Sequence, residues 1–244
     1  MKKLLGCFLP VFISLTLSAQ NKQFDTTALL IIDRMADVIG DLRSCSFKLN
    51  AANDYADSSF GLRKEFSDYS VYMSGPDKML INAHGHKGHR QYMYDGSQVA
   101  YYSFDENNYG LIPAPETIIK MIDSVHTHYD VEFPAADFFY PAFTDDLMED
   151  ADIIRYNGIV TVGGKEYFDI QASGKEKNFE FWISNDAYTL PARFVITYKT
   201  QKGSPQYLAS FSEWEINPDL PAAMFTFLPP PNAHEIRIMS KNDQ

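Results

Sequence analysis

Histidines are the side chains best suited to metal chemistry in this sequence, because five of the six fall in two short groups. The first group is His84, His86 and His89, and the second lies within residues 126–128. Alternate residues of a β-strand point to the same face, so the imidazoles of His84 and His86 could share a metal ion. The glycines around them equally fit a mobile hairpin tip. The sequence therefore leaves open a metal-binding envelope protein that uses this group, with or without hydrolysis.

Motifs for other kinds of catalysis do not occur in the chain. The acidic run over residues 145–152 lacks the ligand spacing and the central glycine of a calcium loop. There is no Gly-x-Ser-x-Gly elbow, no phosphate-binding glycine loop and no His-Glu-x-x-His sequence. Because no nucleophile with a partnered base can be chosen, we expect no enzymatic activity and no cofactor.

Residues 1–19 have the layout of a secretory signal peptide. Two lysines start the segment, an apolar run follows over residues 4–17, and a Leu-Ser-Ala sequence ends at Ala19. The apolar run is shorter than the roughly 20 residues of a transmembrane helix, and no later segment is as apolar over that length. We therefore expect cleavage near Ala19, export from the cytoplasm and a mature chain without a transmembrane anchor.

Charge and cysteine content restrict the partners of the mature chain and the means of its stabilisation. The formal net charge is -11, and loss of the signal peptide lysines makes it more negative, which disfavours nucleic acid as a partner. Cleavage also removes Cys7 and leaves Cys45 as the single cysteine. Since no intramolecular disulfide can then form, the hydrophobic core alone must hold the fold.

Hydrophobic spacing predicts one amphipathic helix and then a series of antiparallel strands. Residues 26–42 carry their apolar side chains on one stripe, and from Ser44 the period changes to two. Turn sequences follow one another closely enough for a meander rather than for crossover connections. Further strands are expected over residues 58–74, 78–84, 90–95, 98–104, 153–162, 165–173, 178–184, 192–200 and 206–216, with short ones near Phe225 and at 236–238.

Residues 111–152 interrupt the strand pattern with several prolines and with apolar residues at helical spacing. We expect this segment to be a helical lid insertion across one side of the sheet. The remainder of residues 20–244 shows no repeat and no linker, so a single α+β domain of roughly ten strands is the simplest interpretation.

Several short motifs follow one another along the mature chain, among them Gly75-Pro76-Asp77-Lys78, Tyr94-Asp95-Gly96, Trp182-Ile183 and Phe225-x-Phe227-x-Pro229-Pro230. Their order resembles a family of predicted periplasmic proteins of unknown function. That family is grouped with the LolA/LolB-like lipoprotein carriers and the RseB-type envelope sensors. The resemblance implies a periplasmic location and a strongly curved antiparallel half-barrel, with helices that plug its concave face.

The resemblance also implies an apolar cavity between the helices and the sheet. A protein of this kind would be a non-catalytic carrier or sensor of a lipid or a lipid-modified protein, monomeric and served by a docking partner in the envelope. Aromatic stripes are equally typical of an ordinary core, so the sequence leaves a filled interior open. The residues expected to contact the ligand are Ile118, Met121, Ile122, Phe138, Phe139, Phe143, Phe181 and Ile196.

Overall fold

The computed structural model of the protein describes residues 22–241, so the expected signal peptide lies outside the described residues. Within this range thirteen strands join one sheet, accompanied by three α-helices and two short 3-10 helices. The strands are β1 (Gln23–Phe24), β2 (Ser44–Asp57), β3 (Gly61–Ser74), β4 (Lys78–Gly85), β5 (Gly88–Tyr94), β6 (Gln98–Ser103), β7 (Asn108–Pro113), β8 (Ala151–Val162), β9 (Lys165–Gly174), β10 (Lys177–Ser184), β11 (Pro191–Tyr198), β12 (Gln206–Ile216) and β13 (His234–Glu235). The helices are α1 (Thr26–Gly40), α2 (Ile118–Tyr129), η1 (Ala136–Phe139), α3 (Phe143–Asp150) and η2 (Ala222–Phe225).

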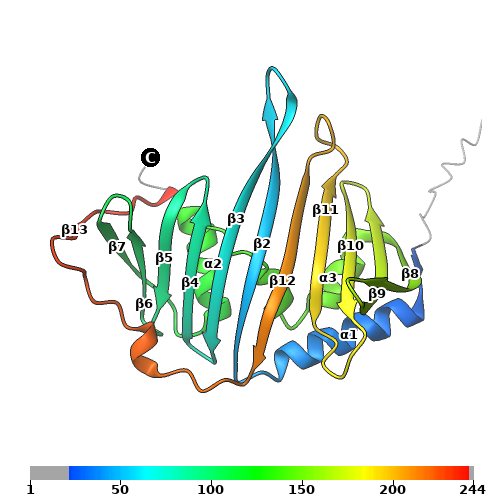
Figure 1. The fold of residues 1–244 in the computed structure, drawn as a ribbon, viewed down its shortest axis with the longest axis horizontal. Helices are drawn as coiled ribbons and strands as arrows, with labels where there is room; N and C mark the ends of the chain where they lie inside the picture. The colour runs from blue at the N-terminus through cyan, green and yellow to red at the C-terminus, as the bar shows by residue number, and fades with distance from the viewer. Residues whose placement is uncertain (1–21, 242–244) are drawn as a thin grey trace, which may run out of the picture.

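Two antiparallel meanders make up most of the sheet. Strands β2 to β7 form one and β8 to β12 form the other, and pairing of β12 with β2 joins them. The spatial order therefore places β7 and β8, which are consecutive in the chain, near opposite edges of the sheet. Figure 1 shows α2 and α3 behind the strands, within the connection between these two edges.

The α+β class and the large, mostly antiparallel sheet are confirmed. The expected first helix is also confirmed, and it ends at Gly40, two residues before the predicted end. The short strand expected near Phe225 is wrong. Phe225 belongs to the 3-10 helix η2. Its ring packs on the face of the sheet opposite the α-helices, and its backbone is not part of a strand. The last short strand lies at His234–Glu235 and not at the predicted residues 236–238.

Strand β7 was missed because Gly110 and Pro113 resemble a break in the strand pattern. Pro113 is the last residue of β7, where a missing backbone donor is tolerated. Gly110 is required by packing, since a Cβ atom there would lie 2.6 Å from the side chain of Ile238. Pro113 therefore marks the end of the strand, and Gly110 marks a position where the C-terminal segment comes close to it.

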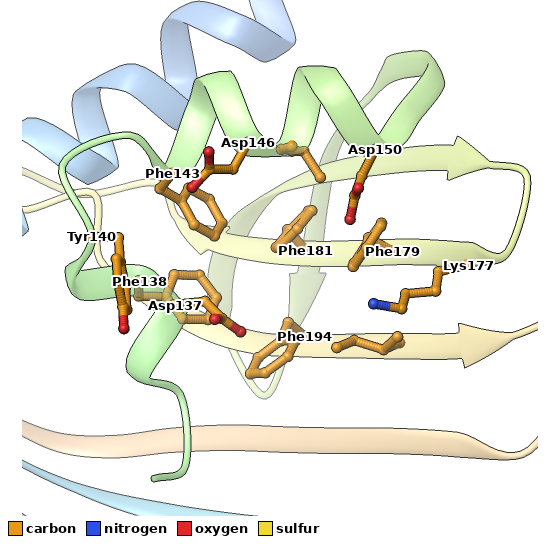
Figure 2. A pocket seen from close by; sticks show the side chains of 12 residues that line it. Asp137, Phe138, Tyr140, Phe143, Asp146, Asp150, Lys177, Phe179, Phe181 and Phe194 are labelled. Atoms are coloured by element: carbon orange, nitrogen blue, oxygen red, sulfur yellow. The ribbon is translucent and has the colours of Figure 1, made fainter. Parts of the chain in front are cut away.

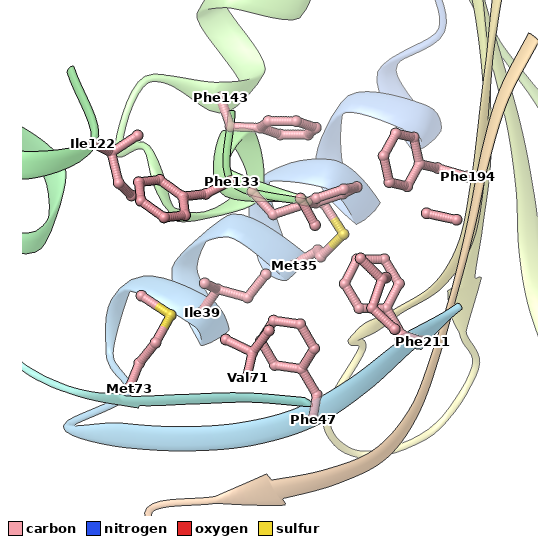
Figure 3. Close-up of a cluster of buried hydrophobic side chains, with 14 of the residues drawn as sticks. Met35, Ile39, Phe47, Val71, Met73, Ile122, Phe133, Phe143, Phe194 and Phe211 are labelled. Atoms are coloured by element: carbon pink, nitrogen blue, oxygen red, sulfur yellow. The ribbon is translucent and has the colours of Figure 1, made fainter. Parts of the chain in front are cut away.

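Helix α1 begins at a side-chain cap and buries one stripe against the sheet. The Asp25 carboxylate accepts a hydrogen bond of 2.8 Å from the backbone N–H of Thr27. Met35 and Ile39 on the buried stripe face Phe47 and other side chains of the strands, as Figure 3 shows. Side chains of α2, η1 and α3 complete this core, so all three α-helices pack on the same face of the sheet.

The opposite face carries a smaller core under the C-terminal segment. Phe225 is 1% exposed and packs with Leu80, Met93 and Ala100. The chain then continues to β13, which pairs in parallel with the start of β7, while β1 pairs in parallel with β8 at the other edge. Two-residue strands thus cover part of each edge of the sheet.

No helix within residues 22–241 combines the length and the apolar character that a membrane crossing requires.

Replacement of Met35 by alanine tests the packing of α1 on the sheet. Met35 is completely buried, so Met35→Ala should lower the free energy of unfolding by about 2 to 5 kcal/mol. Leu30→Ala on the same helix is the matched control. Leu30 is 63% exposed, and this change should shift stability by less than about 0.5 kcal/mol. Urea denaturation measures both, and equal effects would show that α1 is not seated on the sheet as described.

Candidate functional site

A cavity of about 280 Å³ lies between the insertion and the sheet, and we call it the aromatic cavity. Five phenylalanines line it, three of them from β10 and β11 and two from η1 and α3. Figure 2 shows the rings of Phe143, Phe181 and Phe194 directed into the space between α3 and the two strands. The full lining is Asp137, Phe138, Tyr140, Phe143, Asp146, Leu147, Asp150, Lys177, Phe179, Phe181, Phe194 and Ile196.

Phe138 fixes one wall of this cavity through ring contacts. Its centroid lies 5.0 Å from that of Phe143, 5.1 Å from that of Phe194 and 5.5 Å from that of Phe211. The contacts with Phe194 and Phe211 are edge-to-face, which is a favourable arrangement of aromatic quadrupoles. The ring of Phe138 is only 3% exposed, so it belongs to the supporting wall more than to the open surface.

Charged side chains form the edge of the aromatic cavity. Asp146 and Asp150 come from α3, Asp137 comes from η1, and Lys177 is the first residue of β10. Lys177 also favours the charged form of Asp137 electrostatically. The cavity therefore combines an apolar interior with a rim of three carboxylates and one ammonium group.

A second cavity of about 370 Å³ adjoins the first, and we call it the tyrosine cavity. The two share Asp137, Tyr140, Lys177, Phe194 and Ile196 as lining residues. The second is distinguished by three tyrosines and by polar groups from the end of α2 and the following loop. Its other lining residues are Asn53, Tyr69, Ile122, Asp123, His126, Val131, Glu132, Phe133, Pro134, Ala135, Ala136, Tyr198 and Tyr207.

The surroundings of these cavities shift several pKa values. Burial raises the pKa of the Asp137 carboxyl, and the ammonium of Lys177 opposes this shift in part. Burial likewise raises the pKa of Tyr207. The pKa of Tyr140 is raised first by burial and then by its hydroxyl, which donates a 2.6 Å hydrogen bond to Asp123. Tyr140 and Tyr207 therefore stay neutral hydrogen-bonding groups at physiological pH.

The eight residues expected at the ligand site divide among several places. Phe138, Phe143, Phe181 and Ile196 meet around the aromatic cavity. Ile122 lines the tyrosine cavity. Ile118 and Phe139 line a separate cavity of about 270 Å³ near the C-terminal end of α1, and the completely buried Met121 belongs to the core.

Polar residues of the two cavities were missed by the sequence reasoning. Asp137 is next to Phe138 in the chain, and Lys177 follows a turn. Neither residue interrupts a run of apolar residues, so the sequence pattern does not mark either of them as part of a site. Tyr198 and Tyr207 occupy alternating positions of expected strands. The available signal was the regular spacing of these tyrosines with apolar residues along the strands. It indicated that both faces of the strands are covered, but not that a cavity lies against one of them.

The first histidine group is arranged differently from the expectation. Strand β4 ends at Gly85, so His86 lies in the turn, with its Nε2 atom 3.4 Å from Oε1 of Glu65. The shared strand face expected for His84 and His86 is therefore wrong. His84 instead stacks on His89 across the strand pair, with ring centroids 3.6 Å apart. Across residues 22–241, no three or more His, Cys, Asp or Glu side chains form a group that could hold a metal ion.

The fold and the two cavities define an α+β protein with a ligand-sized space between a large antiparallel sheet and the helices that cover it. The chain belongs to the family described as Predicted periplasmic protein (DUF2092), whose model matches residues 28–239. This confirms the family indicated by the sequence motifs. No curated protein matches the chain.

Several solved structures share part of this arrangement at low sequence identity. An uncharacterized conserved protein from Thermus thermophilus matches with a TM-score of 0.48 and 15% identity, over 86% of this chain and 99% of that chain. The Mycobacterium tuberculosis lipoprotein LppX matches with a TM-score of 0.43 and 13% identity, over 81% and 99%. A LolA superfamily protein from Nitrosomonas europaea matches with a TM-score of 0.37 and 10% identity, over 82% and 97%.

The raised pKa of Asp137 predicts a pH-dependent cost to stability. The folded protein holds this proton at pH values where the unfolded chain has lost it, so the wild type loses stability as pH rises from about 3.9 through the folded-state pKa. Asp137→Asn removes the ionisation, and the variant should be more stable than the wild type at pH 7. The difference should vanish in acid, below the ordinary carboxyl pKa.

Denaturant midpoints at neutral and acid pH measure this difference. Asp146→Asn, at another carboxylate on the same rim, is the control and should change stability little at either pH. Equal stability of Asp137→Asn and the wild type at pH 7 would contradict the assigned effect of burial.

Proposed function

We propose that the protein is a non-catalytic binder of a hydrophobic ligand, a lipid or a lipid-modified protein, and that it acts in the periplasm. The observation that carries this proposal is the aromatic cavity, in which five phenylalanine rings face a space that is partly open to solvent. Rings and aliphatic side chains supply apolar contact but no nucleophile, so we assign the protein no reaction. The family description supports the periplasmic location.

Burial of an acyl chain supplies a free energy of the same order as micromolar binding requires. Each methylene transferred from water contributes about 0.8 kcal/mol, so roughly ten methylenes offer about 8 kcal/mol before ordering costs. Micromolar binding corresponds to about 8.2 kcal/mol. The aromatic cavity is near the lower end of the range for small-molecule sites, about 300 to 1,000 Å³, so it suits one chain better than several.

The remaining parts of the proposal concern the molecule as a whole. Residues 20–244 act as one monomeric domain after cleavage near Ala19, with residues 111–152 as the lid and a docking partner at the membrane. The sheet curves as a half-barrel around its helices, so that a ligand enters between lid and strands. The packing of α1, α2 and α3 on a single face supports this arrangement.

A negative charge introduced into the cavity wall tests the proposal. Ile196 lines both cavities, and Ile196→Asp should weaken binding of a neutral monoacylglycerol with a pyrene-labelled acyl chain by at least about tenfold, because a carboxylate would have to be desolvated. Ile159→Asp makes the same change at a 52% exposed position of β8 and should leave binding unaltered. Fluorescence titration gives both affinities, and unchanged binding by Ile196→Asp would refute the position of the site.

Material bound to the protein from the envelope provides a second test. Organic extraction of protein purified from the periplasm, followed by mass spectrometry, should yield an acylated molecule in near-stoichiometric amount. The Ile196→Asp protein, purified in parallel, should yield much less. An extract free of acylated molecules from the wild type would count against a lipid-binding role.

A further inference from the structure

The tyrosine cavity differs chemically from the aromatic cavity that it adjoins. Tyr69, Tyr198 and Tyr207 are all half-buried and come from three different strands, and they form its floor on the side of the sheet. The segment that follows α2 supplies the opposite side, including Glu132 and Phe133. This space therefore offers ring faces and hydroxyl groups where the aromatic cavity offers mainly phenylalanine rings.

Carboxylates outnumber cations around the tyrosine cavity. Asp123, Glu132 and Asp137 line it, against Lys177 and His126. Asp123 accepts the hydrogen bond from the hydroxyl of Tyr140 through one oxygen atom, and Glu132 and Asp137 are two further carboxylates of the lining. Glu132, Asp137, Tyr198 and Tyr207 all line this one cavity. Burial raises the pKa of both tyrosines, and the charges of the two carboxylates add to the shift.

Two observations indicate a cationic ligand group here. Asp137 is exposed and lines both cavities, so its carboxylate is accessible to a ligand. Aromatic faces beside such a carboxylate attract cations, since the face of each ring carries negative charge within about 6 Å of its centroid. An ammonium group satisfies both the carboxylates and the rings.

Lys177 lies at the boundary of the two cavities and is the cation of that boundary. A ligand whose acyl chain occupies the aromatic cavity must bring its polar part past this side chain. An anionic group of the ligand would contact the Lys177 ammonium there, and the rest of the polar part would continue into the tyrosine cavity. Lys177 shares this boundary with Asp137, while Glu132 and the three tyrosines line only the tyrosine cavity beyond it.

We propose that the tyrosine cavity receives the head group of a zwitterionic phospholipid whose acyl chain occupies the aromatic cavity. The phosphate lies against Lys177, and the primary ammonium lies among Glu132, Asp137 and the three tyrosine rings. The order of charges in the lipid, phosphate first and ammonium beyond it, matches Lys177 at the boundary and Glu132 beyond it. This inference rests on the proposed function, because the acyl chain must be held in the aromatic cavity.

The test compares the single-chain lyso forms of phosphatidylethanolamine and phosphatidylglycerol with identical acyl chains, because the aromatic cavity suits one chain; both carry the phosphate, but only the first carries the ammonium. Isothermal titration calorimetry should show that the wild type binds phosphatidylethanolamine at least about tenfold more tightly. The double variant Glu132→Gln with Asp137→Asn should lose this preference and keep its affinity for phosphatidylglycerol. Lys177→Gln should weaken the binding of both lipids to a similar extent.

Asp145→Asn is the matched control, since Asp145 is an exposed carboxylate of α3 that lines neither cavity. It should retain the preference for phosphatidylethanolamine. A native far-ultraviolet spectrum establishes that each variant is folded, and the single variant Glu132→Gln, at an exposed side chain, serves if the double variant is not.

The possible results separate the two proposals. Equal affinity of the wild type for both lipids, or a preference that persists in the folded double variant, overturns the assignment of the head group and leaves acyl binding in place. A preference abolished by Asp145→Asn alone would come from the overall charge of the protein and not from this cavity, and it overturns the assignment as well. Binding of neither lipid refutes the proposed function together with this inference.

Discussion

The connection between β7 and β8 has to cross one face of the sheet, because these consecutive strands lie near opposite edges. The crossing is the constraint on which the site depends. Residues 114–150 must bring apolar side chains to the strands along the way, and the ring of Phe138 does so near the middle of the path, in contact with rings of β10, β11 and β12. Helices that cover one face of the sheet thus follow from strand order.

The short helix η1 within this crossing explains why a cavity remains between the helices and the sheet. The 3-10 helix η1 has only four residues, so neighbouring side chains point in different directions within a single turn. Phe138 enters the core, while Asp137 stays at the surface of both cavities. A longer amphipathic helix would present a continuous apolar stripe and fill the space. The short turn instead leaves room between rings and brings a carboxylate to its edge.

The sequence predicted the periodic parts of this fold and failed where packing replaces periodicity. The α1 helix followed from its single buried stripe, and most strands followed from apolar residues at strand spacing between turn sequences. Strand β7 and the contact of η2 were missed, because the packing of Gly110 and of Phe225 depends on residues that are distant in the sequence. For the site, spacing identified Phe138 and Ile196 but could not distinguish cavity lining from core, as the buried Met121 illustrates. That distinction depends on how far lid and sheet stand apart.

The pairing of β1 with β8 and of β13 with β7 affects how far the edges of the sheet are open to pairing with other chains. An open strand edge is a template on which other chains can pair and aggregate. Here segments 23–24 and 234–235 occupy part of that template at the two sides of the sheet. Each covers only two positions, and the rest of β8 includes Ile159 and Val162, which are about half exposed. Short pieces of the chain thus block part of each edge, and release of either piece would lengthen the strand edge on which another chain could pair.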